Sequence, residues 1–478
     1  MSEFGYQLKK MLEESEISIN SFAKTIQIDR SYLYRIFSGA KAISPEKLQT
    51  ILTCDLFTKS QCDQLRTAFY TEKYGAEQYA RISAILQGLE ELRAGESLSE
   101  PFAAADHAGE DETSTYTSRR SLSSAIAQKI SDACKTGEDY LYTNFSSSQA
   151  EIDKAIYALL RRLPEPVAFT YLTTLDTTGK TTHNIRTIFS ALKYISLGYG
   201  VLCRYRNAYG RGYPGTLYPY FIYCRRGLML FDAPAEHGVW IPAKYLNDSV
   251  EQSIQKLAED YSPMAMFTRS IFELKNYIAN FSQLENTTQS LSYTPCIGPY
   301  LTEEMYRDII NPDIPNVEYI IASTLGHYQT ANNNRTIFTI EGLREFVQTG
   351  EINEFPQALM RKPLSPAHRV EILQQMINRF RRNNQNLLLL DSGKIRFPQG
   401  YNIEFYVQDQ LKVIFAATTQ RMDANDYLYN TLIPIEDPIL TTDLMAVYEY
   451  LIDNHMIYSA HYTEHLLGDL LTLAKSLC

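Results

Sequence analysis

Residues 19–54 carry a dense series of helix start and stop signals, which leaves little freedom in how this segment folds. Asp29 is a favourable N-cap residue, and Ser44 followed by Pro45 marks a second helix start, because proline is tolerated at the first helical position. Between them, Gly39 can adopt the left-handed conformation that commonly ends a helix. The segment therefore predicts two short helices in quick succession.

Apolar residues fall where three short helices would pack against one another. In the helix after Asp29, this leaves Arg30, Ser31, Tyr34 and Arg35 on the free face. The positions expected to face inward are Leu8, Met11, Leu12, Phe22, Ala23, Ile26, Ile28, Leu33 and Ile36.

The order of these signals resembles the family of helix-turn-helix regulators that includes the phage repressors and Cro, often called XRE-like. The resemblance covers residues 4–70 and follows the family in register through the buried alanine, the tight turn, the capped helix, the glycine and the Ser-Pro pair. It departs from the family at Gln27, where many members have glycine, and at Phe37, where a glutamate is common. Neither departure breaks the expected fold.

The resemblance implies that this region binds double-stranded DNA, with the third helix in the major groove. It assigns Arg30, Ser31 and Tyr34 to base edges, where an arginine can bond guanine through two hydrogen bonds. Side chains that contact phosphates hold the protein in register without distinguishing sequence. By the same analogy, those contacts come from Asn20, Ser21, Arg35 and Lys41.

The distribution of charge agrees with a DNA-binding region. The whole chain has a net charge of -10, but residues 21–50 hold five basic residues against two acidic ones, a net charge of +3. A small basic module on an acidic body suits a protein that touches DNA through one face.

The sequence shows no sign of export or membrane insertion. It has no apolar run of the roughly 18 residues that a membrane span needs, and no signal-peptide pattern at its N-terminus. The seven cysteines form no C-x-x-C pair. We therefore expect a cytoplasmic protein with reduced thiols and no membrane partner.

Beyond the first helices, the patterns predict an α+β multidomain protein. The all-α helix-turn-helix domain is expected at 1–70, and a helical extension and linker at 71–120. A large mixed α/β effector region would follow as two subdomains, at 121–300 and 301–478. The segment 317–324 is expected to be a strand.

The effector region also shows a repeated order of elements. A helix followed by three strands that end in a hairpin is expected at 183–233 and again at 366–418. The two hairpin segments, 217–233 and 401–417, align with each other by eye. Two explanations stay open: an internal duplication, or the frequent recurrence of helix–strand–strand orders in α+β proteins.

Two short motifs match catalytic patterns only by letter. The glycines at 210, 212 and 215 match a dinucleotide fingerprint, but Pro214 lies among them and no helix follows. The segment His461-x-x-Glu464-His465 matches a zinc-peptidase pattern, although a solvated polar helix face is the simpler interpretation. We expect no catalytic residue, no metal site, no cofactor and no enzymatic activity.

We therefore expect a sequence-specific transcription regulator that acts as a homodimer. A region of more than 350 residues beyond the DNA-binding domain favours sensing of an effector, either a small molecule or a peptide. Tyr218 and Tyr220 share one face of a strand and are the candidate ligand contacts. The pocket is expected on sheet faces built from 201–206, 217–224 and 402–407.

Two alternatives remain open. A peptide-pheromone-responsive regulator would carry the same N-terminal module, but it would need an all-helical repeat body, against which the predicted strands argue. An enzyme or an interaction platform tethered to DNA is the second alternative. An enzyme would be indicated by a cluster of polar groups in one cleft with a nucleophile or a metal.

Overall fold

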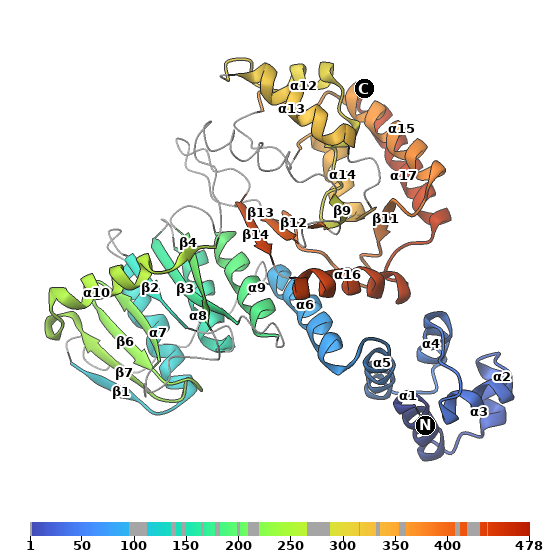
Figure 1. Cartoon of the computed structure of the whole chain (residues 1–478), viewed down its shortest axis with the longest axis horizontal. Helices are drawn as coiled ribbons and strands as arrows, with labels where there is room; N and C mark the ends of the chain where they lie inside the picture. The colour runs from blue at the N-terminus through green and yellow to red at the C-terminus, as the bar shows by residue number, and fades with distance from the viewer. Residues whose placement is uncertain are drawn as a thin grey trace. The chain divides into compact units, whose positions relative to one another are not determined.

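The computed structural model divides into two compact units (Figure 1). Unit 1 consists of Met1–Ile85 and Asp443–Ile457, and unit 2 of Leu86–Thr442 and Tyr458–Cys478. No helix in the described ranges is both long and apolar enough to cross a membrane. The structure describes residues 2–94, 112–134, 140–145, 149–163, 167–176, 182–197, 201–208, 219–264, 287–314, 316–330, 335–352, 360–406, 412–417, 431–436 and 438–478.

Unit 1 is helical, and in it α3 and α4 begin after Asp29 and Ser44, and α3 ends at Gly39, as the sequence signals predict. The Asp29 side chain accepts a hydrogen bond from the Ser31 backbone N–H at 2.7 Å, and Ser44 caps the helix that begins at Pro45. Gly39 has φ 78°, in the left-handed region. The helices are α1 (Glu3–Glu14), α2 (Ile19–Thr25), α3 (Arg30–Ser38), α4 (Pro45–Leu52), α5 (Lys59–Tyr74), the first half of α6 (Ala76–Ala94) and most of α16 (Pro438–Asp453).

The core of unit 1 is formed by the residues that the apolar pattern selected, each of them at most 8 % exposed. The turn between α2 and α3 has φ 54° at Gln27, where many family members have glycine. The Ile28 N–H donates to the Ala23 carbonyl at 3.0 Å and closes this turn. The glutamine therefore keeps the turn, at the cost of a conformation that glycine adopts more easily.

Unit 2 contains two sheets. The first has the strand order β1-β7-β6-β5-β2-β3-β4-β8, and the second has the order β11-β10-β9-β12-β13-β14. The strands of the first sheet are β1 (Ser114–Tyr116), β2 (Tyr140–Thr143), β3 (Ala168–Asp176), β4 (Val201–Ala208), β5 (Tyr220–Cys224), β6 (Gly227–Phe231), β7 (Gly238–Pro242) and β8 (Ser262–Pro263). Those of the second are β9 (Thr287–Ser292), β10 (Arg335–Thr339), β11 (Leu387–Leu390), β12 (Tyr401–Tyr406), β13 (Lys412–Ala417) and β14 (Thr431–Glu436).

The two sheets repeat one topology. The run β4-β3-β2-β5-β6-β7 in the first sheet corresponds to β11-β10-β9-β12-β13-β14 in the second. In each run the first three strands are parallel, and the fourth pairs antiparallel to its neighbour and opens a meander. The β5–β6 and β12–β13 pairs thus occupy the same place in the two sheets, which is the arrangement that an internal duplication produces.

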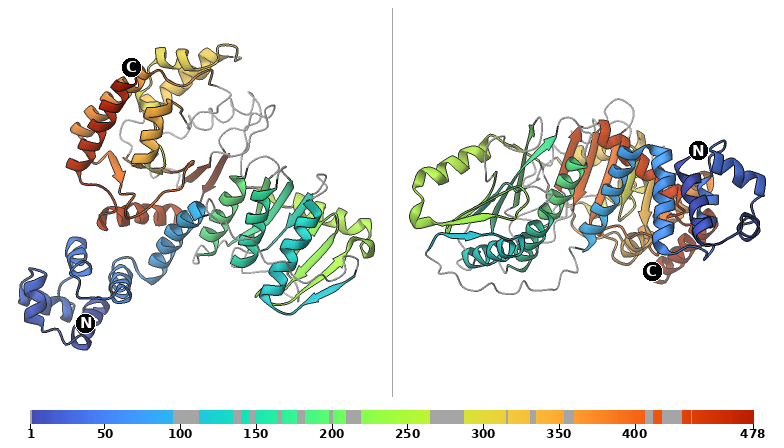
Figure 2. Two further views of the ribbon diagram at one scale, coloured as in Figure 1. Left: turned by 180° about the vertical axis from the view of Figure 1, so that it is seen from behind. Right: turned by 90° about the horizontal axis from the view of Figure 1, so that it is seen from below.

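Helices cover both faces of the first sheet (Figure 2). The Tyr194 ring of α9 lies 4.9 Å from Phe169 and 5.5 Å from Tyr171 of β3. Leu172, the next residue of β3, points to the opposite face and packs with Ala258 of α10. The helices around this sheet are α7 (Arg119–Ala133), α8 (Ala150–Arg162), α9 (His183–Ile195) and α10 (Asp248–Glu259).

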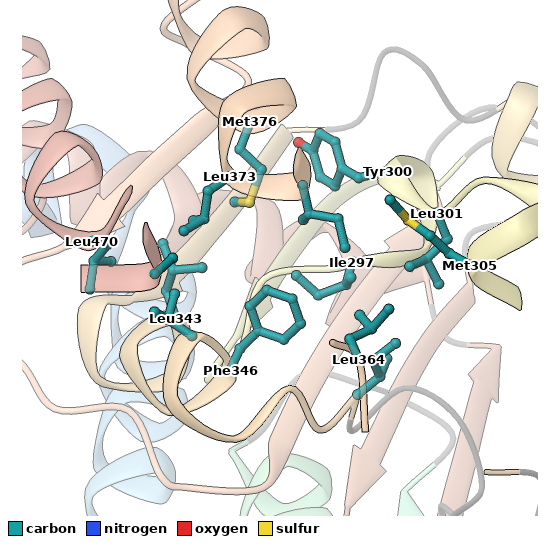
Figure 3. Packing of buried hydrophobic residues seen from close by; sticks show 14 of the residues in the cluster. Ile297, Tyr300, Leu301, Met305, Leu343, Phe346, Leu364, Leu373, Met376 and Leu470 are labelled. Carbon is teal, nitrogen blue, oxygen red and sulfur yellow. The ribbon is translucent and has the colours of Figure 1, made fainter. Parts of the chain in front are cut away.

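The second sheet has its own apolar core, formed largely between helices. Leu343 and Phe346 converge there with Leu373, Met376 and Leu470 (Figure 3). The helices are α12 (Glu303–Ile309), α13 (Val317–Thr330), α14 (Ile340–Thr349), α15 (Pro366–Arg382) and α17 (Ala460–Ser476).

The prediction of a strand at 317–324 is wrong, because this segment lies in helix α13. Its β-branched residues gave it a strand-like composition. The buried positions Ile320, Ile321 and Thr324 instead follow helical spacing, and the Thr324 hydroxyl donates to the Ile320 carbonyl one turn back, at 2.7 Å.

We predict that Gly5→Ala destabilises unit 1 by about 1–3 kcal/mol. A Cβ on Gly5 would lie 2.3 Å from the Ile36 carbonyl oxygen, so α1 and α3 would have to separate. Hydrogen exchange of the α1 core amides in the full chain measures the loss.

Gly468→Ala in α17 is the matched control. A Cβ on Gly468 has no neighbour within 4 Å, so the change should stabilise its helix by about 0.5–1 kcal/mol. Exchange in α1 that is equally slow in Gly5→Ala and in the parent chain would contradict the close approach of the two helices.

Candidate DNA-binding site

The exposed face of α3 carries the four side chains that the sequence placed there. Arg30, Ser31, Tyr34 and Arg35 are exposed, while Leu33 is fully buried beneath them. The Arg30 guanidinium donates a hydrogen bond to the Tyr34 hydroxyl at 3.2 Å and lies 5.4 Å from the centre of the ring. The two residues therefore present a joined polar and aromatic surface at the start of α3.

A second group of cations surrounds one buried ring. Tyr32 is 9 % exposed, and its ring centre lies 6.0 Å from the Arg35 guanidinium, 4.9 Å from Lys41 Nζ and 3.9 Å from Lys47 Nζ. Aromatic faces attract cations, so this ring holds three positive charges from α3, α4 and the loop between them. We call Arg35, Lys41 and Lys47 the Tyr32 cluster.

The remaining phosphate-contact candidates, Asn20 and Ser21, are exposed in the first turn of α2. All seven predicted DNA contacts therefore lie on accessible surface of unit 1. Lys47 was not among them, because helical periodicity alone does not show that a lysine of α4 reaches a tyrosine of α3. The sequence signal that did cover Lys47 was the net positive charge of residues 21–50.

Carboxylates at the helix starts are held in their charged form. Hydrogen bonds from Ser31, first from its side chain and then from its backbone, hold the pKa of the Asp29 carboxyl below its usual value. A hydrogen bond from the Ser44 side chain similarly lowers the pKa of Glu46. Asp29, the cap of α3, and Glu46, in the first turn of α4, are therefore both charged at neutral pH.

The three strands expected to border a ligand site in unit 2 are not neighbours in one sheet. Residues 201–206 and 219–224 belong to the same sheet, but β2 and β3 lie between their strands. Residues 402–406 belong to the other sheet, so a pocket that all three segments border stays a prediction. Tyr220 is half-buried with its ring 5.8 Å from Phe231, and Tyr218 lies outside the described residues.

The zinc-like motif has other partners. Glu464 pairs with Arg381 at 2.7 Å, and His465 pairs with Asp469 at 3.1 Å. Within the described ranges there is no group of three or more His, Cys, Asp or Glu residues placed to hold a metal ion. The glycines at 210, 212 and 215 lie outside the described residues.

The capped third helix, its exposed polar face and the cations beside it define the class of DNA-binding helix-turn-helix domains. Residues 8–53 match the family model described as helix-turn-helix, which confirms the resemblance to the Cro/repressor type for this region. The rest of the chain matches no family model, and no curated protein matches the chain.

Solved structures show only remote similarity. TrmBL2, an archaeal chromatin protein with a novel mode of DNA binding, is 11% identical with a TM-score of 0.20, covering 48% of this chain and 86% of its own. Polyphosphate kinase from Porphyromonas gingivalis is 11% identical with a TM-score of 0.22, covering 71% of this chain and 50% of its own. Scores this low carry no argument about either the fold or the function.

We predict that the Ser31 amide reports the titration of Asp29, with a midpoint below about 3.9, the ordinary value for aspartate. Because the folded pKa is lowered, the stabilisation from this cap is complete above the unfolded pKa and is lost as pH falls through the folded pKa. The amide chemical shift of Ser31 between pH 2 and 6 measures it. In the control Asp29→Asn the cap remains but cannot titrate, and a midpoint above the ordinary value in the parent would contradict the assignment.

Proposed function

We propose that this chain is a sequence-specific transcription regulator that inserts α3 into the major groove of double-stranded DNA. The observation that carries the proposal is the exposed pair Arg30 and Tyr34 at the start of a capped helix in a region that matches the helix-turn-helix family. Side chains at the start of the recognition helix contact base edges in this class.

The two groups of residues have different roles in this proposal. Arg30, Ser31 and Tyr34 contact bases, where the Arg30 guanidinium offers the donors that guanine accepts. The Tyr32 cluster and the exposed Asn20 and Ser21 contact phosphates and set the register. The positive charges of the Tyr32 cluster are held against one ring, so they meet the DNA backbone as a preformed patch.

Unit 2 acts in this proposal as the effector-sensing part of the regulator rather than as an enzyme. One buried polar cluster in it, centred on Asp153, is satisfied by its own side chains. The Asp153 carboxylate accepts hydrogen bonds from Ser190 at 2.9 Å and Tyr194 at 2.8 Å, and it pairs with Lys193. The two sheets also disfavour the pheromone-responsive alternative, which requires an all-helical body.

We predict that Arg30→Ala weakens binding to the preferred site by about 1–3 kcal/mol and relaxes the preference at one base. Lys47→Ala should weaken binding about equally on all sequences and reduce the salt dependence by about one charge. Selection of binding sites from random duplexes, followed by titrations at several salt concentrations, measures both effects. An equal loss on random DNA for Arg30→Ala would show that this residue contacts only phosphate.

We predict that the protein binds DNA as a homodimer on two-fold symmetric half-sites about one helical turn apart. One helix-turn-helix contacts only a few base pairs, so a second copy supplies affinity and specificity. Sedimentation of the full chain at micromolar concentration, alone and with a duplex that carries the selected site, gives the stoichiometry. One chain per duplex on the complete site would overturn this prediction.

A further inference from the structure

The DNA-binding unit is completed by a segment from near the other end of the sequence. Residues 443–457, here called the return segment, belong to unit 1 together with the helix-turn-helix. Its apolar side chains are as buried as those of α1 to α3. They include Leu444 at 2 % exposed, Val447 at 1 %, Tyr450 at 4 % and Leu451 at 0 %.

A buried ion pair joins the return segment to α6. The Arg81 Nε lies 2.6 Å from the Asp443 Oδ2, with the Arg81 side chain 13% exposed and the Asp443 side chain 1% exposed. Such a pair tolerates little displacement, because separation leaves a charge in a poorly hydrated place. The relative position of α6 and α16 within unit 1 is therefore tightly constrained at this point.

Further along α16, an aromatic group joins the return segment to α5. The Tyr450 ring centre lies 4.5 Å from that of Tyr70 and 6.5 Å from that of Tyr79. Tyr70 is fully buried, and its burial raises the pKa of its hydroxyl. Lys73 of α5 pairs with Asp453 at the end of α16.

The last contact reaches the helix next to α3. The Gln49 side chain of α4 donates to the Asn454 side chain at 3.3 Å, and Asn454 itself caps α16 by donating to the Tyr450 carbonyl at 2.8 Å. Lys47, a member of the Tyr32 cluster, lies on the same helix as Gln49. The return segment thus contacts α4, α5 and α6.

Two helices continue from one unit into the other. The division between the units falls after Ile85 within α6 and after Thr442 within α16. Arg81 and Asp443 lie close to these two crossing points along the chain. A continuous helix transmits displacement along its length, because its backbone hydrogen bonds resist bending.

We propose that the return segment regulates the DNA-binding helices: a change in unit 2 displaces α16, and the Arg81–Asp443 pair and the Gln49–Asn454 contact pass the displacement to α4 and α3. The inference rests on the proposed function and deepens it by naming the path of regulation. It places the coupling in α6 and α16 rather than in the part of the expected 71–120 segment that follows α6, of which residues 95–111 lie outside the described residues.

The test compares two substitutions on α16 in the full chain. Asp443→Asn removes the buried charge, and Glu449→Gln makes the same chemical change at an exposed position of the same helix. Hydrogen exchange is followed with and without a duplex that carries the selected site. Because coupling between sites is reciprocal, DNA bound to the parent chain should slow exchange along all of α16, including its first turn in unit 2.

Asp443→Asn should lower DNA affinity about tenfold, abolish the DNA-dependent protection of the amides of residues 439–442, and speed exchange in α4 without DNA. Glu449→Gln should leave all three unchanged. The inference is overturned if the protection in the parent chain stops within Met1–Ile85, or if the two variants behave alike. If Asp443→Asn does not fold, Arg81→Lys, which keeps the charge but alters the donor geometry, provides the same comparison.

The outcome for this inference is separable from that for the proposed function. A parent chain that binds no duplex would refute the proposed function. In that case the DNA-free exchange of α4 alone decides the inference. Faster exchange in Asp443→Asn than in Glu449→Gln supports the mechanical link, and equal exchange refutes it.

Discussion

The burial of one side of α3 determines what this protein can present to DNA. Leu33 and Ile36 are inserted into the core of unit 1, and Gly5 lets α1 approach the Ile36 carbonyl closely enough to hold the helix there. With that side fixed, the helical period directs Arg30 and Tyr34 to the opposite side. The polar surface is therefore a consequence of apolar packing, and a substitution that loosens the core also displaces the side chains proposed to contact DNA.

The local features of unit 1 could be predicted because each has a short-range cause. Asp29, Ser44 and Gly39 act on residues within one turn of themselves, so a single sequence suffices to locate the helices that they begin or end. The exposed positions of α3 follow from the same periodicity. The prediction of a strand at 317–324 was wrong because its cause is not local. The composition of the segment favours a strand, whereas burial against the rest of the fold selects a helix.

Features that join distant parts of the chain could not be predicted. Gln49 and Asn454 are 405 positions apart, and nothing in the composition of either segment indicates that they meet. Lys47 and Tyr32 are closer in sequence, but their contact depends on how α4 crosses α3. The topological repeat in unit 2 could be predicted only in part. The two hairpins were recognisable from their sequences, whereas the common strand order required the pairing between strands.

The discontinuity of unit 1 also bears on how the protein is made. A ribosome that adds roughly 5–20 residues per second completes the helix-turn-helix before unit 2 is made, but the return segment emerges only after residues 86–442. Until then the Tyr70 ring lacks Tyr450, which packs against it, and the Arg81 guanidinium lacks Asp443, its ion-pair partner. A prematurely terminated chain therefore carries an unfinished DNA-binding unit.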